Sequence, residues 1–304
     1  MKHIALVFRP NIDSESIFKT LSDHFTNHCR FYLINPDDEN QICKISKKNA
    51  DSIGLTLQAD CSENGLIDGE TALFKKKPDC ILVFGGDGTI LRSLHYASNF
   101  HAPILGFNMG TLGFLTDCKI NELIPSINMF INGKYQIEKR MLLDISVIRN
   151  NERIIHLPAL NDAVIYKGEL SKLITLKLFS NKRYVYETRC DGIITATPTG
   201  STAYSMSSGG PIISPDMEAF VVNPLNPHVL SIRPMIFNAE DTLHFKLEEP
   251  HSSTVLQIDG VNVVQLLPKD KITIKRSTKK MCFIKLSHRT FYQILRKKLK
   301  MGKL

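Results

Sequence analysis

Apolar residues in the first 135 positions alternate between short continuous runs and stretches at helical spacing. Runs that predict strands occupy residues 3–8, 31–34, 80–84 and 103–106. The run at 80–84 is apolar throughout, which is typical of a strand buried on both faces. Helical spacing predicts helices at residues 14–26, 90–98 and 122–131, the first with Ser14 as its N-cap. Strands that alternate with helices predict a parallel sheet covered by helices, an α/β domain.

After about residue 135, closely spaced strand-like runs separated by turn residues replace this alternation. They lie at residues 142–149, 154–157, 163–166, 173–179, 184–188, 242–247, 255–258, 261–267 and 272–274. Such a rhythm predicts an all-β, sandwich-like domain. We therefore expect an α/β nucleotide-binding domain at residues 1–135 and a β-rich domain at 136–287. A basic helix within residues 288–304 is expected to pack back on the N-terminal domain.

Composition excludes several classes of protein. With 43% hydrophobic and 22% charged residues, the 304-residue chain is neither disordered nor fibrous. It has no apolar run near the roughly 20 residues of a membrane helix, and its first residues lack the order of a signal peptide. We expect a soluble, cytoplasmic protein. The seven cysteines form no C-x-x-C pair, which argues against a zinc site or a disulfide framework.

The net charge of +8 is concentrated at one end of the chain. Residues 269–304 contain 13 Lys or Arg and a single acid, Asp270, so the other 268 residues carry −4. A basic end is compatible with nucleic acid, an anionic membrane or a solvated helix face. Because the motifs described below all precede residue 269, we expect neither a nucleic-acid nor a membrane partner. The basic end could still draw phosphates toward the site if it folds back beside residues 85–89.

The first motif is Gly85-Gly86-Asp87-Gly88-Thr89, between a predicted buried strand and a predicted helix. This position is the carboxyl end of a parallel strand, where ligands bind. Glycines let the backbone approach a phosphate, and the helix start favours an anion. Asp87 can accept a hydroxyl proton. A simple Asp-Gly hairpin turn is the alternative, but the flanks are strand and helix rather than two strands.

The second motif is a stretch rich in hydroxyl groups at residues 191–205, fixed by Pro198 and opened by Gly200. Ser and Thr hydroxyls and loop N–H groups suit sugar hydroxyls, phosphates or an adenine edge. An ordinary Ser/Thr turn would be shorter. A third feature, Asn161-Asp162, is by itself more typical of a turn or cap.

Together these motifs resemble the NAD kinase family. The similar stretches are colinear: GGDGT at 85–89, NMGTLGFL at 108–115, Asn161-Asp162, DGIITATPTGSTAYS at 191–205 and PHVLSIRP at 227–234. The resemblance extends over about residues 80–265. GGDGT alone is not specific, because diacylglycerol and sphingosine kinases carry a similar motif and phosphofructokinases a close relative. The TPTGSTAYS and LGF stretches point to NAD kinases.

The resemblance implies a reaction and its ligands. NAD kinases transfer the γ-phosphoryl group of ATP, or in some members of polyphosphate, to the 2′-hydroxyl of the adenosine ribose of NAD, giving NADP. The family fold joins an α/β domain to a β-rich, NAD-binding domain. Its members are homodimers or homotetramers. Mg²⁺ or another divalent cation would accompany ATP, without an assigned protein ligand.

Site residues follow from the same resemblance. Asp87 matches the catalytic aspartate, and the donor loop is Gly85, Gly86, Gly88 and Thr89. The NAD contacts are implied at Asp87, Gly88, Phe114, Asn161, Asp162, Lys172, Arg189, Asp191, Thr202, Ala203, Tyr204 and Ser207. Lys172 and Arg189 are the less specific matches.

Two positions depart from the family pattern. Asp162 stands where the family usually has Glu, so the carboxylate reaches about one methylene less far. Val261 follows Asp259-Gly260 where Gln is usual, which removes a polar contact. Both departures affect the predicted affinity more than the type of reaction.

Two other functions stay open at this point. A lipid kinase could share GGDGT and use the basic end at a membrane, although residues 191–205 argue against it. A dinucleotide sensor without activity could keep the fold, although Asp87 is intact. We assign no catalytic role to any histidine.

Overall fold

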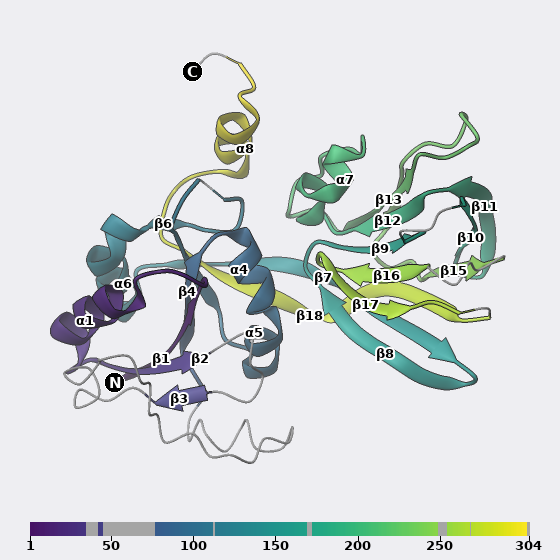
Figure 1. Ribbon diagram of the computed structural model, residues 1–304. Helices are drawn as coiled ribbons and strands as arrows, with labels where there is room; N and C mark the ends of the chain where they lie inside the picture. The colour runs from purple at the N-terminus through teal and green to yellow at the C-terminus, as the bar shows by residue number, and fades with distance from the viewer. Residues whose placement is uncertain are drawn as a thin grey trace. The chain divides into compact units, whose positions relative to one another are not determined.

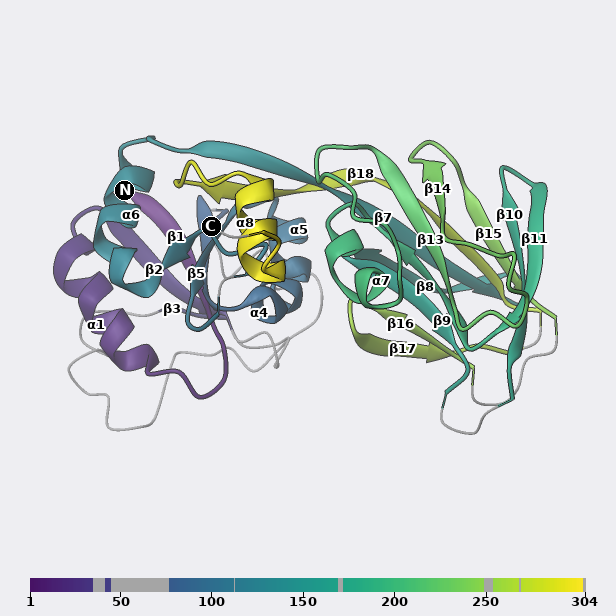
Figure 2. The same ribbon diagram turned by 90° about the horizontal axis from the view of Figure 1, so that it is seen from above.

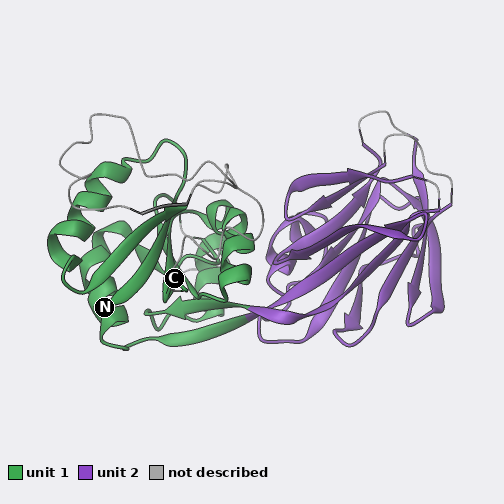
Figure 3. Cartoon of the chain, turned by 90° about the horizontal axis from the view of Figure 1, so that it is seen from below, with its two compact units in different colours: residues 1–139, 281–304 green, residues 140–280 purple. Residues whose placement is uncertain are grey.

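In a computed structural model of the chain, the structure describes residues 1–34, 42–44, 77–111, 113–168, 172–248, 254–267 and 269–302. For residues 42–44 it describes only the backbone. Leu112, within the stretch at 108–115, and Cys61, one of the seven cysteines, lie outside the described residues. The chain divides into unit 1, residues 1–139 with 281–304, and unit 2, residues 140–280 (Figure 3). Unit 2 thus ends at residue 280, whereas the β-rich domain was expected to end at residue 287.

Unit 1 is built on a parallel sheet. Its strands follow the order β3 (Ile42–Lys44), β2 (Cys29–Ile34), β1 (Lys2–Phe8), β4 (Cys80–Gly85) and β5 (Ile104–Asn108), and both β6 (Cys118–Lys119) and β18 (Lys271–Lys285) pair with β5. All of these pairs are parallel except β2–β3. β4 is buried along its whole length, as its apolar sequence predicts.

Helices cover both faces of this sheet (Figure 1). One face carries α1 (Ser14–Phe25) and α6 (Leu123–Ile131), which share a core with the sheet. The other carries α4 (Asp87–Arg92) and α5 (Leu94–Phe100). The helix expected at 90–98 therefore starts earlier, at Asp87, and is interrupted at Ser93. The Ser93 hydroxyl donates to the Ile90 carbonyl over 2.8 Å, which competes with regular helix bonding.

Within the described residues, the strands of unit 2 form two antiparallel sheets, and the short helix α7 (Tyr204–Ser207) follows β12 (Figure 2). One has the order β14 (Met235–Asn238), β13 (Ala219–Leu225), β12 (Gly192–Ala196), β9 (Asp162–Tyr166), β16 (Val255–Ile258) and β17 (Val261–Gln265). The other contains β11 (Arg183–Cys190), β10 (Ile174–Ser180), β15 (Leu243–Leu247), the first part of β18, β7 (Gln136–Arg149) and β8 (Glu152–Ala159). Leu143, Leu176 and Phe220, from both sheets, share one core. The expected α/β domain and β-sandwich-like domain are thus confirmed.

The strand pattern missed part of this fold. β13 and β14 were not predicted, because Asn223 and Pro224 interrupt the apolar run of β13 although both are buried. The expected strand at 272–274 is one end of the longer β18, whose middle, Lys275–Lys280, is charged and partly exposed. No helix in the described part of the chain is long and apolar enough to cross a bilayer.

Candidate active site

The glycine loop, residues 85–89, comprises the end of β4, Gly86 and the first turn of α4, and it is open on one side. A Cβ added at Gly85 would overlap the Thr89 hydroxyl, so this glycine is required for close packing. A Cβ added at Gly86 or Gly88 would meet no atom within 4 Å. Thr89 itself is buried behind the loop. Gly86 and Gly88 therefore face open space, whereas the buried Thr89 packs behind the loop.

The carboxylate of Asp87 is held by the backbone of residues 113–115. Its Oδ2 accepts a hydrogen bond from Phe114 N over 2.8 Å, and its Oδ1 accepts one from Leu115 N over 3.0 Å. A Cβ at Gly113 would overlap Oδ1, so only glycine lets this segment approach. Each carboxylate oxygen keeps a second lone pair. The arrangement fixes the carboxylate and leaves it able to accept a further hydrogen bond.

The cation of Lys298, from α8 (Phe291–Leu299), approaches the same carboxylate. Its Nζ lies 3.7 Å from Asp87 Oδ2 and 4.3 Å from the centre of the Phe114 ring. The basic end thus does fold back beside the glycine loop.

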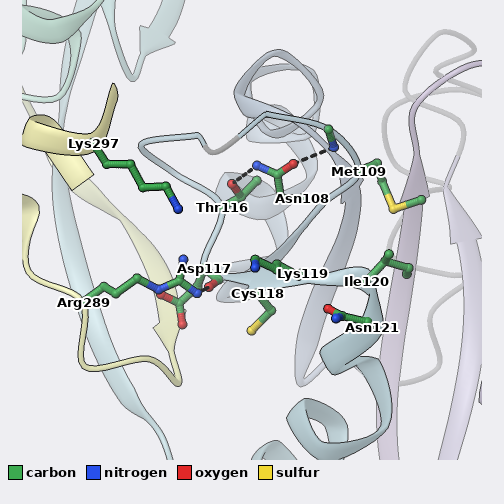
Figure 4. Close-up of a pocket in the computed structure, with 11 residues that line it drawn as sticks. Asn108, Met109, Thr116, Asp117, Cys118, Lys119, Ile120, Asn121, Arg289 and Lys297 are labelled. Carbon is green, nitrogen blue, oxygen red and sulfur yellow. Dashed lines mark hydrogen bonds between the residues drawn. The ribbon is translucent and has the colours of Figure 1, made fainter. Parts of the chain in front are cut away.

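A cavity of about 420 Å³ opens nearby in unit 1, at the ends of β5 and β6 (Figure 4). Lys297 and Arg289 reach toward it from the C-terminal segment, across from Asn108. Asn108 Nδ2 donates to Thr116 Oγ1 over 3.3 Å at the cavity wall. The cavity is lined by Asn108, Met109, Gly110, Thr116, Asp117, Cys118, Lys119, Ile120, Asn121, Arg289 and Lys297, and Asp87 is not among these residues.

In unit 2, Asn161 and Asp162 are positioned by a partly buried carboxylate, Asp259. It accepts hydrogen bonds from the backbone N–H groups of three consecutive residues: Leu160 over 2.8 Å, Asn161 over 2.7 Å and Asp162 over 3.0 Å. Asp259 lies in the turn between β16 and β17, with a φ of 47°. The start of β9 is therefore attached to a turn almost a hundred residues away.

Burial raises the pKa of Asp162 from its ordinary 3.8 to about 7, and the negative charge of Asp259 acts in the same direction. Burial also raises the pKa of Asp259, against the effect of its three N–H donors. Because those donors favour the ionised form of Asp259, Asp162 is the carboxyl that holds a proton just below neutral pH.

The loop after β12 packs directly on Asn161. Thr197 N donates to the Asn161 carbonyl over 2.8 Å, and Thr197 Oγ1 donates to the Leu160 carbonyl over 2.5 Å. A Cβ at Gly200 would overlap the Asn161 backbone. Thr197 and Ser201 are fully buried and bonded within the loop. These two hydroxyls hold the loop together, and neither is among the predicted NAD contacts.

The remaining predicted residues of this stretch are more accessible. Thr202 and Ala203 are half-buried, Ser207 is exposed, and Tyr204 is 47% exposed. Arg189 and Lys172 are exposed. Within unit 2 the fold thus places the start of β9 and the loop after β12 together.

Asp191 is the most strongly paired of the predicted contacts in unit 2. Lys167 Nζ lies 2.7 Å from its Oδ1, and Asn226 Nδ2 donates to its Oδ2 over 2.8 Å. The hydrogen bonds from Lys167 and Asn226 lower the pKa of Asp191 below its ordinary value. This carboxylate stays ionised and is aligned by two partners from neighbouring loops.

Two family models match most of the chain. The N-terminal domain of ATP-NAD kinases matches residues 5–135, and the C-terminal domain of these kinases matches residues 160–286. An NAD kinase of Desulforamulus reducens is 40% identical over 240 residues, covering 79% of this chain and 82% of the relative. One from Natranaerobius thermophilus is 34% identical and covers 99% of both chains.

The chain belongs to the NAD kinase family.

It is a phosphotransferase that converts NAD to NADP with ATP as the donor, as the motifs predicted. Solved NAD kinases have the same fold. Yeast NADH kinase complexed with NADH gives a TM-score of 0.81 at 23% identity, covering all of this chain and 89% of that one. An NAD kinase from Archaeoglobus fulgidus in complex with ATP gives 0.71 at 23% identity, covering 99% and 100%.

Sequence reasoning missed three residues of this NAD kinase. Asp259 was noted only as part of a dipeptide, although an Asp-Gly turn between two strands could have signalled it. Lys167 follows β9 and carried no signal of its own. Lys298 belongs to a run of cations in the last turn of α8, and only the fold distinguishes it from its neighbours.

Proposed function

We propose that Asp87 is the general base of the NAD kinase reaction. The 2′-oxygen of the adenosine ribose attacks the γ-phosphorus of ATP, the bond to the β,γ-bridging oxygen breaks, and the hydroxyl proton passes to a carboxylate oxygen of Asp87. ADP leaves with the electron pair of the broken bond. One observation carries this role: Asp87 is fixed by two backbone N–H groups next to glycines that leave space open.

The donor is assigned to the same loop. Gly86 and Gly88 let the phosphates approach the backbone, and Gly85 and Thr89 shape the loop from behind. Within the described residues no group of three His, Cys, Asp or Glu side chains could hold a metal ion. We therefore write Mg²⁺ as part of the donor, MgATP, since Mg²⁺ is commonly bound by substrate phosphates and water.

Unit 2 supplies the contacts to the dinucleotide in this proposal. Asn161 and Asp162 would hold ribose hydroxyls, with Tyr204 against the adenosine and Asp191 toward the nicotinamide end. Phe114 and Gly88 of unit 1, and Lys172, Arg189, Thr202, Ala203 and Ser207 of unit 2, complete the assignment. The dinucleotide bound in the yeast structure supports NAD as the acceptor, and the nucleotide bound in the Archaeoglobus fulgidus structure supports ATP as the donor.

The proposal is tested by incubating the purified chain with NAD, Mg²⁺ and ATP, and by measuring NADP with a dehydrogenase specific for NADP. Parallel reactions replace ATP with inorganic polyphosphate or replace NAD with NADH. A diacylglycerol reaction represents the lipid-kinase alternative. We expect NADP from NAD and ATP. Bound NAD without turnover would instead support the sensor hypothesis, and a phosphorylated lipid without NADP would support the lipid kinase.

We further propose that the chain forms a homodimer or homotetramer through β14 and the segment before it. Large apolar side chains are exposed there: Leu230 is 83% exposed and Ile236 is 55% exposed. β14 is also at the end of its sheet, so its outer edge can pair with another strand. The exposed apolar side chains and the free edge of β14 can each meet the same feature on a second copy. The proposed occupant is therefore a second copy of this chain.

Light scattering of Ile236→Lys tests this interface, since a buried lysine would oppose association. Tyr184→Lys, on β11 in the other sheet, is the matched control and is expected to keep the oligomer. An unchanged mass for Ile236→Lys would exclude this edge.

A further inference from the structure

The C-terminal helix α8 is rigidly attached to unit 1. Its N-terminus has a reciprocal cap, in which Thr290 N donates to Gln293 Oε1 over 2.9 Å and Gln293 N donates to Thr290 Oγ1 over 3.3 Å. Ile294 and Leu295 are buried. The Phe291 ring packs on the ring of Phe114, with 6.2 Å between their centres. The helix is therefore a fixed element rather than a solvated tail.

The segment that leads into α8 is fastened to Asp117. This buried carboxylate accepts hydrogen bonds from Leu286 N, Ser287 N and Ser287 Oγ over 2.7, 2.9 and 2.7 Å, and Lys285 Nζ is 2.7 Å away. Burial alone would raise the pKa of Asp117, but Lys285 and the hydrogen-bond donors hold it below its ordinary value. These contacts set where α8 begins and so where its last turn ends.

The last turn brings two consecutive lysines to different places. Lys297 lines the cavity of Figure 4, whereas Lys298 reaches Asp87 and the face of Phe114. The separation of 3.7 Å between Lys298 Nζ and Asp87 Oδ2 is that of an ion pair, longer than a hydrogen bond. The ammonium is thus drawn to this position by charge and by the ring, and its N–H donors can serve a further acceptor.

A phosphoryl group in transfer supplies such an acceptor. Its equatorial oxygens carry negative charge in the transition state, and a catalytic carboxylate beside them adds more. The base and the donor would repel each other unless a cation lies between or beside them. Among the described residues, Lys298 is the cation paired with Asp87.

We propose that Lys298 is a catalytic residue of this chain: its ammonium binds a non-bridging oxygen of the phosphoryl group in transfer while it offsets the charge of Asp87. This inference rests on the proposed role of Asp87 as the base. It gives one residue of the basic C-terminal segment a defined chemical task. The segment as a whole then need not act through its net charge.

The test compares Lys298→Met and Lys298→Arg with Arg296→Met. Arg296 is exposed on the same turn, so its replacement removes the same charge without touching Asp87. We measure kcat and the separate KM values for ATP and NAD. Loss of one transition-state donor is expected to lower kcat of Lys298→Met about 100-fold, with KM for NAD within about threefold. Lys298→Arg keeps the charge and recovers at least part of kcat. Arg296→Met behaves as wild type.

Several results would overturn the inference. One is a kcat of Lys298→Met within about threefold of wild type. Another is an equal loss in Arg296→Met, which would show a general charge effect. A rise in KM for NAD with unchanged kcat would make Lys298 a substrate contact instead. Lys298→Arg also checks folding, because a folded variant keeps the wild-type KM for NAD. If wild type itself forms no NADP, the proposed function fails, and the failure is distinct from a failure of Lys298.

Discussion

The aspartates of the two units are held in opposite ways. Asp87 in unit 1 accepts two N–H groups from one side, and its side chain is 29% exposed. Asp259 in unit 2 accepts N–H groups from three consecutive residues, so its oxygens are directed at the backbone. A carboxylate that must exchange a proton with substrate needs an open side. A carboxylate that organises a loop is most effective when every lone pair it can use is directed at the backbone.

The largest expected effect comes from removing the open carboxylate. Asp87→Asn keeps the shape but loses the proton acceptor, so we expect kcat to fall by about 10²–10⁴. NAD affinity is expected to stay within about tenfold. Steady-state kinetics and equilibrium NAD binding measure the two quantities. Asp79→Asn, at the opposite end of β4, is the control. Wild-type turnover in Asp87→Asn would show that Asp87 is not the base.

The carboxylate of Asp259 is expected to contribute to stability instead. In Asp259→Asn, an NH₂ group replaces one carboxylate oxygen, so one backbone N–H loses its acceptor. The free energy of unfolding is expected to fall by about 2 kcal/mol. Thermal unfolding should shift downward by roughly 4–8 °C. Asp216→Asn, exposed in the same unit, serves as the control. An unchanged midpoint would mean that the Asn161 loop does not depend on Asp259.

Asp162 is expected to affect both stability and NAD binding, and the two effects depend on pH in opposite directions. In the unfolded chain it ionises near its ordinary pKa of 3.8, whereas in the folded chain it keeps its proton up to about 7. The folded state therefore binds more protons between these values. The titration of Asp162 therefore makes the free energy of unfolding fall as pH rises from about 4 to 7, by up to about 1.4 kcal/mol per pH unit. Above pH 7 this contribution no longer changes with pH.

The variant Asp162→Asn is expected to lose this part of the pH dependence in denaturant titrations. NAD binding should respond in the opposite direction, because the ionised carboxylate is the better acceptor for ribose hydroxyls. We expect KM for NAD to fall through pH 7 in wild type and to be flat in Asp162→Asn. Identical profiles would show that Asp162 is ionised throughout or does not contact NAD.

The smallest expected effect is that of Asp162→Glu, which restores the usual residue of the family. The longer side chain keeps the charge and extends the reach, so kcat/KM for NAD is expected to equal or modestly exceed that of wild type. A large loss would mean that the backbone near Asp259 has adapted to the shorter residue. Kinetics at pH 8, where both carboxyls are ionised, provide the cleanest comparison.

The sequence predicted the parts of the molecule that repeat a local rule. The buried run of β4, the glycine loop and the alternation of strands and helices each follow from neighbouring residues, and the structure has them where expected. Contacts between distant segments could not be predicted this way. Nothing near residue 160 indicates that Asp259 will accept its N–H, and nothing near residue 298 indicates a contact with Asp87.

The basic C-terminal segment shows the same limit. A solvated helix face was one interpretation of its charge, but several of its cations pair with acids far away in sequence. Arg276 pairs with Glu218 and Glu240, and Lys285 Nζ lies 2.7 Å from the Asp117 carboxylate. Composition could report the excess of charge, but only the fold shows which charges are compensated.

The discontinuity of unit 1 has a consequence for biosynthesis. Residues 1–139 leave the ribosome first, yet residues 281–304, with the end of β18 and all of α8, belong to the same unit. At about 5–20 residues per second, synthesis of residues 140–280 delays them by roughly 7 to 28 seconds. During that interval the nascent chain carries Asp87 without Lys298 and Asp117 without its partners. A chain that ends before residue 298 would keep the glycine loop but lack the contact between Asp87 and Lys298.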